Sequence, residues 1–209
     1  MQNRKFYLLT CFLFTAAIIF PLFAQDTWKE EFTKEGISVY TRPVEGSSLN
    51  EFKGEALINA SLEVCKNVID DVEKHTVWRP DCIESKLISR NGNIAVSYTR
   101  TKAPWPVSDR DVIVKNEIDI SKDKVVYNFS AINDPELIPL KEGVIRMIKV
   151  TGMWILIRKG NDTLVTYQAK IDPGGSLPAW LANSTAVDQP FKSLQGLKKM
   201  VNKPEFQVK

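Results

Sequence analysis

The sequence predicts an α+β fold in which a curved antiparallel sheet wraps around one long C-terminal helix. Apolar and polar residues alternate with a period of two through most of residues 37–171, which is the spacing of half-buried strands. After the turn at residues 172–175 the apolar spacing changes to that of an amphipathic helix. A sheet wrapped around a single helix does not fill its own interior easily, so we expect this fold to enclose a cavity.

The N-terminal segment has the layout of a secretory signal peptide. Residues 1–5 are short and positive, residues 6–23 are almost wholly apolar, and Ala24 is a small residue before a polar run. The alternative is an uncleaved membrane anchor, because 18 apolar residues reach the lower limit for spanning a bilayer. We therefore expect residues 1–24 to be a signal peptide or membrane anchor and residues 25–209 to be a single exported domain, periplasmic or secreted.

Composition and charge narrow the classes of function. The chain has 209 residues, 44% of them hydrophobic and 25% charged, which is typical of one globular domain. Its 28 basic and 25 acidic residues give a net charge of +3, and removal of Arg4 and Lys5 with the leader would leave +1. Without a basic patch or run, the sequence lacks the electrostatic signature of nucleic-acid binding.

Two strands and a helix are expected first in the mature chain. Residues 37–40 and 51–58 alternate as half-buried strands, and Ser61 is a candidate N-cap with Glu63 in the first helical turn. The segment Trp78-Arg79-Pro80 ends this helix of roughly three turns. The apolar positions that recur at helical spacing are Leu62, Cys65, Val68, Ile69 and Val72.

The rest of the chain predicts a run of strands and a final helix. The strands are expected at residues 83–90, 94–102, 112–120, 125–132, 144–158 and 164–171. Gly, Asn, Asp and Ser residues separate several of them, so consecutive strands are expected to be antiparallel hairpin partners. Pro190 interrupts the final helix, where proline removes an amide donor, and we expect a kink there. One face of that helix carries Leu177, Leu181, Ser184, Val187, Phe191, Leu194 and Val201.

Cysteine and histidine are too few for a metal site. Cys65 and Cys82 remain after leader removal, and they either form a disulfide or are buried separately as small apolar side chains. His75, the only histidine, is expected on the surface. One His and two Cys fall short of the four ligands of a tetrahedral site, so we expect no metal and no cofactor.

Several motifs resemble those of the START (StAR-related lipid transfer) domains. The resemblance spans residues 26–204, in the order of the family. Its most specific parts are the Pro-Trp-Pro-x-x-x-Arg-Asp segment at residues 104–111 and the Asp-Pro-x-Gly-x-x-Pro-x-Trp-Leu segment at residues 172–181. Supporting segments are Trp28, Gly36 to Arg42, Trp78-Arg79-Pro80 and Gly152-Met153-Trp154.

This resemblance implies a helix-grip fold, with a tunnel between the sheet and the last helix that holds one hydrophobic molecule. The family binds sterols, phospholipids, ceramides or related lipids, and several members carry them between membranes. For this chain we accordingly expect a lipid or other hydrophobic small molecule as ligand, transient membrane contact, and a monomer. Its signal sequence departs from many familiar members, so their transfer partners do not carry over.

Strand parity and the helix-grip fold together suggest which side chains face the tunnel. The candidate ligand-binding residues on the sheet are Tyr98, Arg110, Val112, Val114, Asn116, Tyr127, Phe129, Arg146 and Tyr167. Those on the last helix, the expected lid, are Trp180, Leu181, Ser184, Val187 and Phe191. A buried charge needs a partner, so Arg110 either meets an acid, such as Asp109 or Asp111, or receives the polar group of a ligand.

Catalysis is not supported by any motif. The chain has no Gly-x-Ser-x-Gly elbow, no phosphate-binding glycine loop and no evident pair of inward carboxylates. We therefore expect a carrier and not an enzyme. The alternative is a cyclase- or dehydratase-like enzyme acting on a hydrophobic substrate, which the wider helix-grip superfamily includes. It would use Tyr98, Tyr127, Arg110 and Asn116.

Overall fold

The structure is a computed structural model, and it describes residues 27–207. The signal peptide or anchor expected at residues 1–24 lies outside the described residues and stays a prediction. The strands are β1 (Lys29–Lys34), β2 (Ile37–Pro43), β3 (Asn50–Ile58), β4 (Cys82–Asn91), β5 (Ile94–Thr101), β6 (Asp109–Ile120), β7 (Lys124–Ile132), β8 (Val144–Arg146), β9 (Lys149–Lys159) and β10 (Asp162–Asp172). The helices are α1 (Leu62–Asp70), α2 (His75–Trp78) and α3 (Ala179–Met200), with 3-10 turns η1 (Val72–Lys74) and η2 (Pro204–Phe206).

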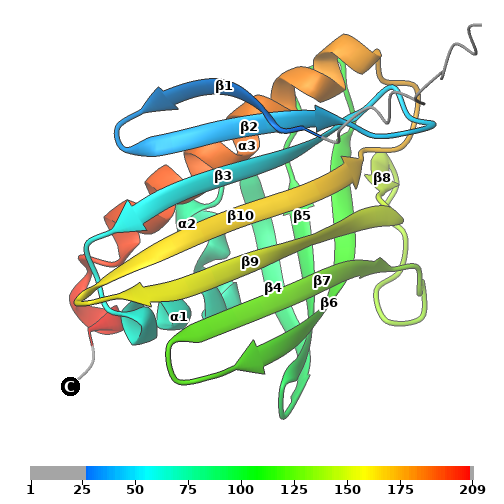
Figure 1. Ribbon diagram of the computed structural model, residues 1–209. Helices are drawn as coiled ribbons and strands as arrows, with labels where there is room; N and C mark the ends of the chain where they lie inside the picture. The colour runs from blue at the N-terminus through cyan, green and yellow to red at the C-terminus, as the bar shows by residue number, and fades with distance from the viewer. Residues whose placement is uncertain (1–26, 208–209) are drawn as a thin grey trace, which may run out of the picture.

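Nine of these strands form one continuous antiparallel sheet in the order β1-β2-β3-β10-β9-β7-β6-β5-β4. The short β8 pairs in parallel with β6, outside that path. The sheet is open, with β1 and β4 at its edges, and it bends around α3 (Figure 1). The expected α+β helix-grip architecture is confirmed.

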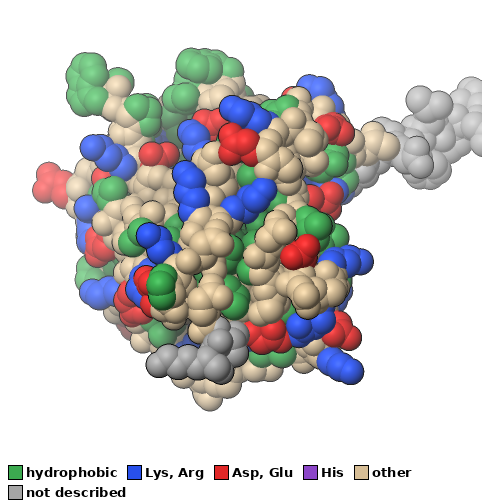
Figure 2. Space-filling view, turned by 90° about the vertical axis from the view of Figure 1, so that its left-hand side faces the viewer, with side chains coloured by type: hydrophobic (Ala, Val, Ile, Leu, Met, Phe, Trp, Pro, Cys, Tyr) green, Lys and Arg blue, Asp and Glu red, His purple; other side chains and the backbone are tan. Residues whose placement is uncertain are grey.

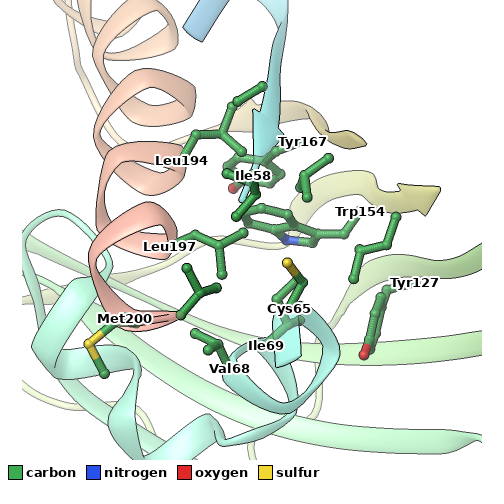
Figure 3. Close-up of a cluster of buried hydrophobic side chains, with 14 of the residues drawn as sticks. Ile58, Cys65, Val68, Ile69, Tyr127, Trp154, Tyr167, Leu194, Leu197 and Met200 are labelled. Carbon is green, nitrogen blue, oxygen red and sulfur yellow. The ribbon is translucent and has the colours of Figure 1, made fainter. Parts of the chain in front are cut away.

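The C-terminal half of α3 is anchored in the core of the sheet. Leu194 and Leu197 are fully buried, and they lie with side chains of α1 against the inner face of the sheet (Figure 3). Gly54 of β3 lets the helix approach closely, since a Cβ there would lie 2.8 Å from Pro190 Cβ and 2.9 Å from Leu194 Cδ1. The first half of α3 extends beyond this anchored part and lies over the end of the sheet that contains the cavity.

Aromatic rings fill the centre of the core. The rings of Trp154 and Tyr167, from neighbouring strands, stack with centroids 4.1 Å apart and planes 6° apart. Helix α1 begins where the sequence predicts, with the Ser61 hydroxyl accepting a hydrogen bond from the Val64 N–H. Cys65 of α1 is buried within this core (Figure 3).

Two strand predictions need correction. The strand expected at 144–158 is broken at residues 147–148, because the Met147 N–H donates to the Asp111 carbonyl and β8 leaves the line of β9. Strand β1 was not predicted, because it is a mostly polar, largely exposed edge strand with little alternation to detect. In the region from residue 27 to residue 207, no helix is long and apolar enough to cross a membrane.

Candidate ligand cavity

A cavity of about 290 Å³ lies between the inner face of the sheet, the α1–α2 segment and the first half of α3. This volume is comparable with the smaller ligand pockets of proteins. Its middle is apolar and aromatic. The side chains there include Phe52, Val112, Val114, Ile118, Phe129, Val150, Trp154 and Tyr167.

Strand register gathers four connections at one end of the cavity, which we call the loop end. It comprises residues 44–49, 102–108, 133–143 and 173–178 together with the start of α3. These connections follow the strand pairs Pro43↔Asn50, Thr101↔Arg110, Ile113↔Ile132 and Lys149↔Asp172, which antiparallel pairing aligns along one edge of the sheet. The cavity-lining residues contributed by these connections are Leu49, Lys102, Ala103, Pro104, Val107, Pro173 and Leu177.

Arg110 lies on the cavity wall at the loop end and is 7% exposed. Its Nη1 donates to the Ser108 carbonyl, and its Nε donates to the Pro173 carbonyl at 3.4 Å. Burial lowers the pKa of Arg110, and the nearby Asp109 carboxylate opposes this shift. No carboxylate within residues 27–207 forms an ion pair with Arg110, so the salt bridge to Asp109 or Asp111 that the sequence suggested is absent there.

A second basic group lines the cavity from the α2–β4 connection. The Arg79 Nη2 donates to the Tyr167 hydroxyl at 3.3 Å, and the guanidinium lies 6.0 Å from the centre of that ring. His75 also lines the cavity and is buried, contrary to the expectation that it is exposed. The reason is the break at Asp71, where α1 gives way to η1 and α2 and the helical periodicity restarts.

The opposite end of the cavity carries a paired polar group. The Asp70 carboxylate accepts from the Tyr127 hydroxyl at 3.2 Å and from Arg90 Nη2 at 3.2 Å, and it also pairs with Lys66. Burial and the Asp70 charge raise the pKa of Tyr127, so its hydroxyl stays protonated. A phenol held this way is a poor general base, which weakens the enzyme alternative.

Eight of the fourteen predicted ligand-binding residues line the cavity. They are Arg110, Val112, Val114, Asn116, Tyr127, Phe129, Tyr167 and Leu181. Their inward orientation follows from the strand parity that the sequence shows. Whether they bind a ligand stays a prediction.

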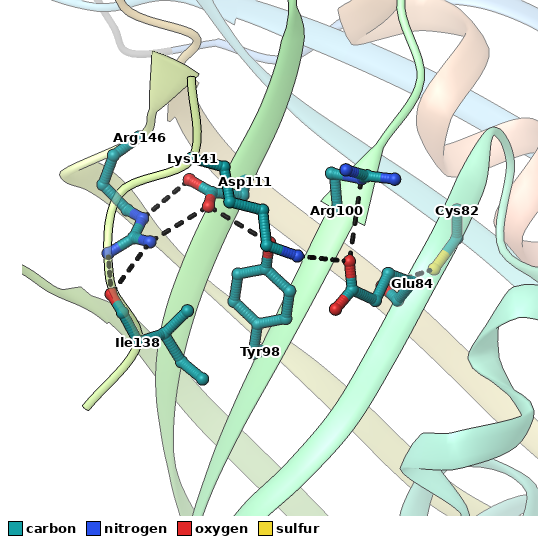
Figure 4. A network of polar contacts seen from close by, with 8 residues as sticks. All are labelled: Cys82, Glu84, Tyr98, Arg100, Asp111, Ile138, Lys141 and Arg146. Atoms are coloured by element: carbon teal, nitrogen blue, oxygen red, sulfur yellow. Dashed lines mark hydrogen bonds and ion pairs between the residues drawn. The ribbon is translucent and has the colours of Figure 1, made fainter. Parts of the chain in front are cut away.

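Tyr98 and Arg146 do not face the cavity, and here the placement was wrong. Both belong to a buried network on the outer face of the sheet, where Asp111 Oδ1 and Oδ2 accept from Arg146 Nε at 2.6 Å and Nη2 at 3.0 Å (Figure 4). The Tyr98 hydroxyl donates to Asp111 Oδ2 at 3.2 Å, and the Ile138 carbonyl accepts from Arg146. The 133–143 connection covers this face and makes it a second buried surface, which strand parity alone does not reveal.

The cavity-facing side of α3 is also rotated from the expected one. Trp180 is 72% exposed and Ser184 is exposed, while Val187 and Phe191 pack against the core on the β1–β2 side, as the Phe32–Phe191 ring contact at 5.4 Å shows. The residues that replace them on the cavity wall are Ala182, Asn183, Thr185, Ala186 and Gln189. Of the apolar residues on the expected face, Val187, Phe191 and Leu194 pack in or against the core instead.

Sequence reasoning also missed the small polar side chains of β5. Ser97, Thr99 and Thr101 line the cavity, on the strand where Tyr98 was expected to do so. Their shared parity was the available signal, but small polar residues are usually assigned to a solvated face. They face the cavity because they alternate along β5 with Tyr98 and Arg100, which face the other side of the sheet.

Cys65 and Cys82 are each free and buried, which leaves the disulfide between them without support. Burial raises the pKa of the Cys65 thiol to about 11 and also raises that of Cys82. Cys82 lines the cavity, and its Sγ contacts the Glu84 carbonyl at 3.6 Å.

Fold and cavity together define the class of this protein. It has a helix-grip fold, with an apolar cavity enclosed between a bent antiparallel sheet and a C-terminal helix. The START domain family model matches residues 21–205, and the chain belongs to this family.

Relatives and solved structures agree with this assignment. The protein PA1579 of Pseudomonas aeruginosa is 37% identical over 180 residues, which cover 85% of this chain and 88% of the relative. START domain-containing protein 10 of Mus musculus is 29% identical over 195 residues, which cover 89% of this chain but 65% of the relative. The crystal structure of the STAR-related lipid transfer protein (fragment 25–204) of Xanthomonas axonopodis has a TM-score of 0.78 at 35% identity, covering 84% of this chain and 99% of the solved one.

Proposed function

We propose that this protein binds one lipid molecule in its cavity and carries it between membranes, as an exported monomer released by cleavage after Ala24. The observation that carries the proposal is the apolar cavity itself, in a chain whose relatives include a protein named for lipid transfer. Burial of hydrocarbon would supply most of the binding free energy, at about 25 cal/mol per Å².

Exposed aromatic side chains support a membrane contact at the loop end. Trp105 is 93% exposed and Trp180 is 72% exposed, and each adjoins a cavity-lining segment of the loop end. Leu140, in the 133–143 connection, is 65% exposed. Hydrophobic side chains stand out from the top of the molecule in Figure 2, the level at which α3 begins in Figure 1.

These side chains have the chemistry of an interfacial anchor. Tryptophan prefers the boundary between headgroups and acyl chains, because its ring is apolar and its N–H remains able to hydrogen-bond. Large apolar groups at the rim of a cavity are exposed to water, and their transfer into a bilayer lowers the free energy. Docking in this orientation would bring the lipid directly to the cavity.

The test is a vesicle assay on a W105A/W180A double variant. Transfer of a fluorescent phospholipid from donor to acceptor vesicles and co-sedimentation with vesicles are both measured. We expect both to fall roughly tenfold or more, because two anchoring rings are removed. The control is I120A, which removes an exposed apolar side chain from the opposite end of β6 and should leave both unchanged.

Two results would contradict the proposal in different ways. Unchanged transfer by the double variant would show that the loop end is not the docking surface. A wild-type protein that takes up no lipid from any vesicle would show that it is not a carrier.

A further inference from the structure

We infer that the cavity selects a lipid with a net negative charge, and that Arg110 binds its phosphate or carboxylate group. This inference rests on the proposed function and adds the class of ligand. It is carried by the contrast between two buried arginines of the same chain.

The guanidinium of Arg110 is buried and forms no ion pair with a carboxylate of residues 27–207. A guanidinium has five N–H donors, and the contacts of Arg110 are two neutral backbone carbonyls, from Ser108 and Pro173. Its Nη2 makes no hydrogen bond to any group in residues 27–207, and the Asp109 carboxylate accepts instead from the Ala103 N–H at 3.1 Å.

Arg146, by contrast, is a buried arginine with a structural role and an acidic partner. Its side chain is 5% exposed, and Asp111, at 1%, receives two of its N–H groups in a fork. A buried charge is costly unless it is paired, and on the outer face of the sheet Arg146 is paired with Asp111. On the cavity face Arg110 has no such acidic partner, although it is adjacent to Asp111 in the same strand.

Arg110 lines the cavity, so a ligand group in the cavity can lie against its guanidinium. Gly175, in the 173–178 connection, has no side chain and a φ of +66°, and a Cβ there would lie 4.0 Å from Arg110 Nη2. The same Cβ would lie 2.7 Å from Ile145 Cδ1, so a side chain at this position would crowd Ile145 next to the guanidinium. Because Arg110 belongs to the cavity wall, an incoming oxyanion can meet its unused Nη2 donors from the cavity side.

The other charges on the cavity wall favour an anion over a zwitterion. Arg79 has a phenol as its hydrogen-bond partner, and among the described residues no carboxylate pairs with it. Of the two acids on the wall, Asp70 is occupied by Arg90 and Lys66, and Asp81 is exposed at the loop end. A quaternary ammonium group would thus find no buried acid free to receive it.

The position of Arg110 fixes the orientation of the ligand. Arg110 lies at the loop end, and the wall beyond it on the same strand continues with Val112 and Val114 toward Trp154. The charged group then sits near the opening and the hydrocarbon fills the interior. This is also the orientation in which a lipid would leave a bilayer at the loop end with the least rotation.

The experiment compares pairs of lipids that share their acyl chains and carry either a charged or a neutral polar end. Delipidated protein is incubated with phosphatidylcholine vesicles containing equal amounts of phosphatidylglycerol and diacylglycerol with matched acyl chains. A second arm uses oleate and methyl oleate. Lipid extracted from the re-isolated protein is quantified, and the ratio of charged to neutral ligand is the readout.

The wild-type protein is expected to retain the charged member of at least one pair in roughly tenfold excess. A charge-assisted hydrogen bond to Arg110 would supply a preference of this size. The phosphatidylglycerol arm identifies a phosphate ligand and the oleate arm a carboxylate ligand. In R110Q the ratio should fall roughly tenfold, and R110K should retain more of it. R100Q is the matched control, since Arg100 lies at the same end of the sheet on the outer face and pairs with Glu84.

Charged-to-neutral ratios near one in both arms, or predominant retention of phosphatidylcholine, would overturn the inference while leaving lipid binding intact. A ratio that R110Q leaves unchanged would overturn the role of Arg110. Absence of any bound lipid would contradict the proposed function and the inference with it. Thermal unfolding is measured for each variant, and the wild-type ratio alone decides if R110Q does not fold.

Discussion

His75 couples the stability of the fold to pH at the scale of a single residue. Its ring is buried beside Trp78, with Nε2 2.9 Å from the Ile69 carbonyl. Burial, with the charge of Arg79 adding to it, lowers the pKa of His75 to about 3, whereas an unfolded chain has a histidine pKa near 6.5. Between these values the unfolded state binds a proton that the folded state does not.

The sign of the pH dependence follows from this difference. We predict that the free energy of unfolding is constant above pH 6.5 with respect to His75 and falls below it, by up to about 1.4 kcal/mol per pH unit. Carboxylates with lowered pKa, such as Glu63 at about 2, lose their contribution only below their unfolded value of 4.5. Urea unfolding between pH 6.5 and 4.5 therefore isolates His75, and H75Q should flatten this part of the profile. A slope that H75Q leaves unchanged would contradict the assignment.

Single residues also show what the sequence could predict of the site. Parity along β6 correctly placed Arg110 and Asn116 on the inner face, because that strand is regular over its whole length. Parity failed for Tyr98 and Arg146, because the 133–143 connection packs over the outer face of the sheet there. Side chains are therefore buried on both faces of the sheet, and alternation does not tell them apart. The ion pair between Arg146 and Asp111 depends on a connection that folds back across the strands, which no local pattern encodes.

At the scale of elements, α3 has two halves with different anchoring. The second half places Ser193, Leu194, Leu197 and Met200 in buried positions, whereas before Pro190 only Ala186 is buried. The first half is held to the β2–β3 turn by Asn183, which accepts from the Asn50 N–H at 2.9 Å and donates to the Ser48 carbonyl at 3.0 Å. The helix is continuous through Pro190.

We predict that amide hydrogens of residues 182–189 exchange with solvent faster than those of residues 191–200. Local opening needs less free energy where few apolar contacts are lost. N183A should accelerate exchange in the first half alone, because it removes two hydrogen bonds to the turn. Hydrogen-exchange mass spectrometry resolves the two halves, and uniform protection along the helix would argue against separate anchoring.

Element boundaries were predictable where alternation was regular and turns carried Gly or Asn. The α1 start at Ser61 and the strands from β4 to β7 follow this rule. The break between β8 and β9 was missed because it depends on the Met147 to Asp111 hydrogen bond, between residues 36 positions apart. The cavity-facing side of α3 was misassigned because the more apolar side packs on β1–β3, through Gly54 and Phe32.

At the scale of the whole molecule, the sheet and the C-terminal helix together enclose the cavity. The order of the larger elements from β2 to α3 was predictable from the sequence, because strand and helix periods are local and the motifs occur in family order. The cavity volume and the balance of charges on its wall were not, since they depend on how strands distant in sequence are brought together. The apolar middle, the unpaired Arg110 and the exposed Trp105 all belong to this assembled level.

The central claim is that the cavity holds a single lipid, and native mass spectrometry of the gently purified protein tests it most directly. The account predicts one bound lipid per chain, released on denaturation and carrying a phosphate or carboxylate group. If the protein is purified empty and, on incubation with vesicles of phospholipid, fatty acid or sterol, still gains no mass, then the cavity is not a lipid site and the account is contradicted.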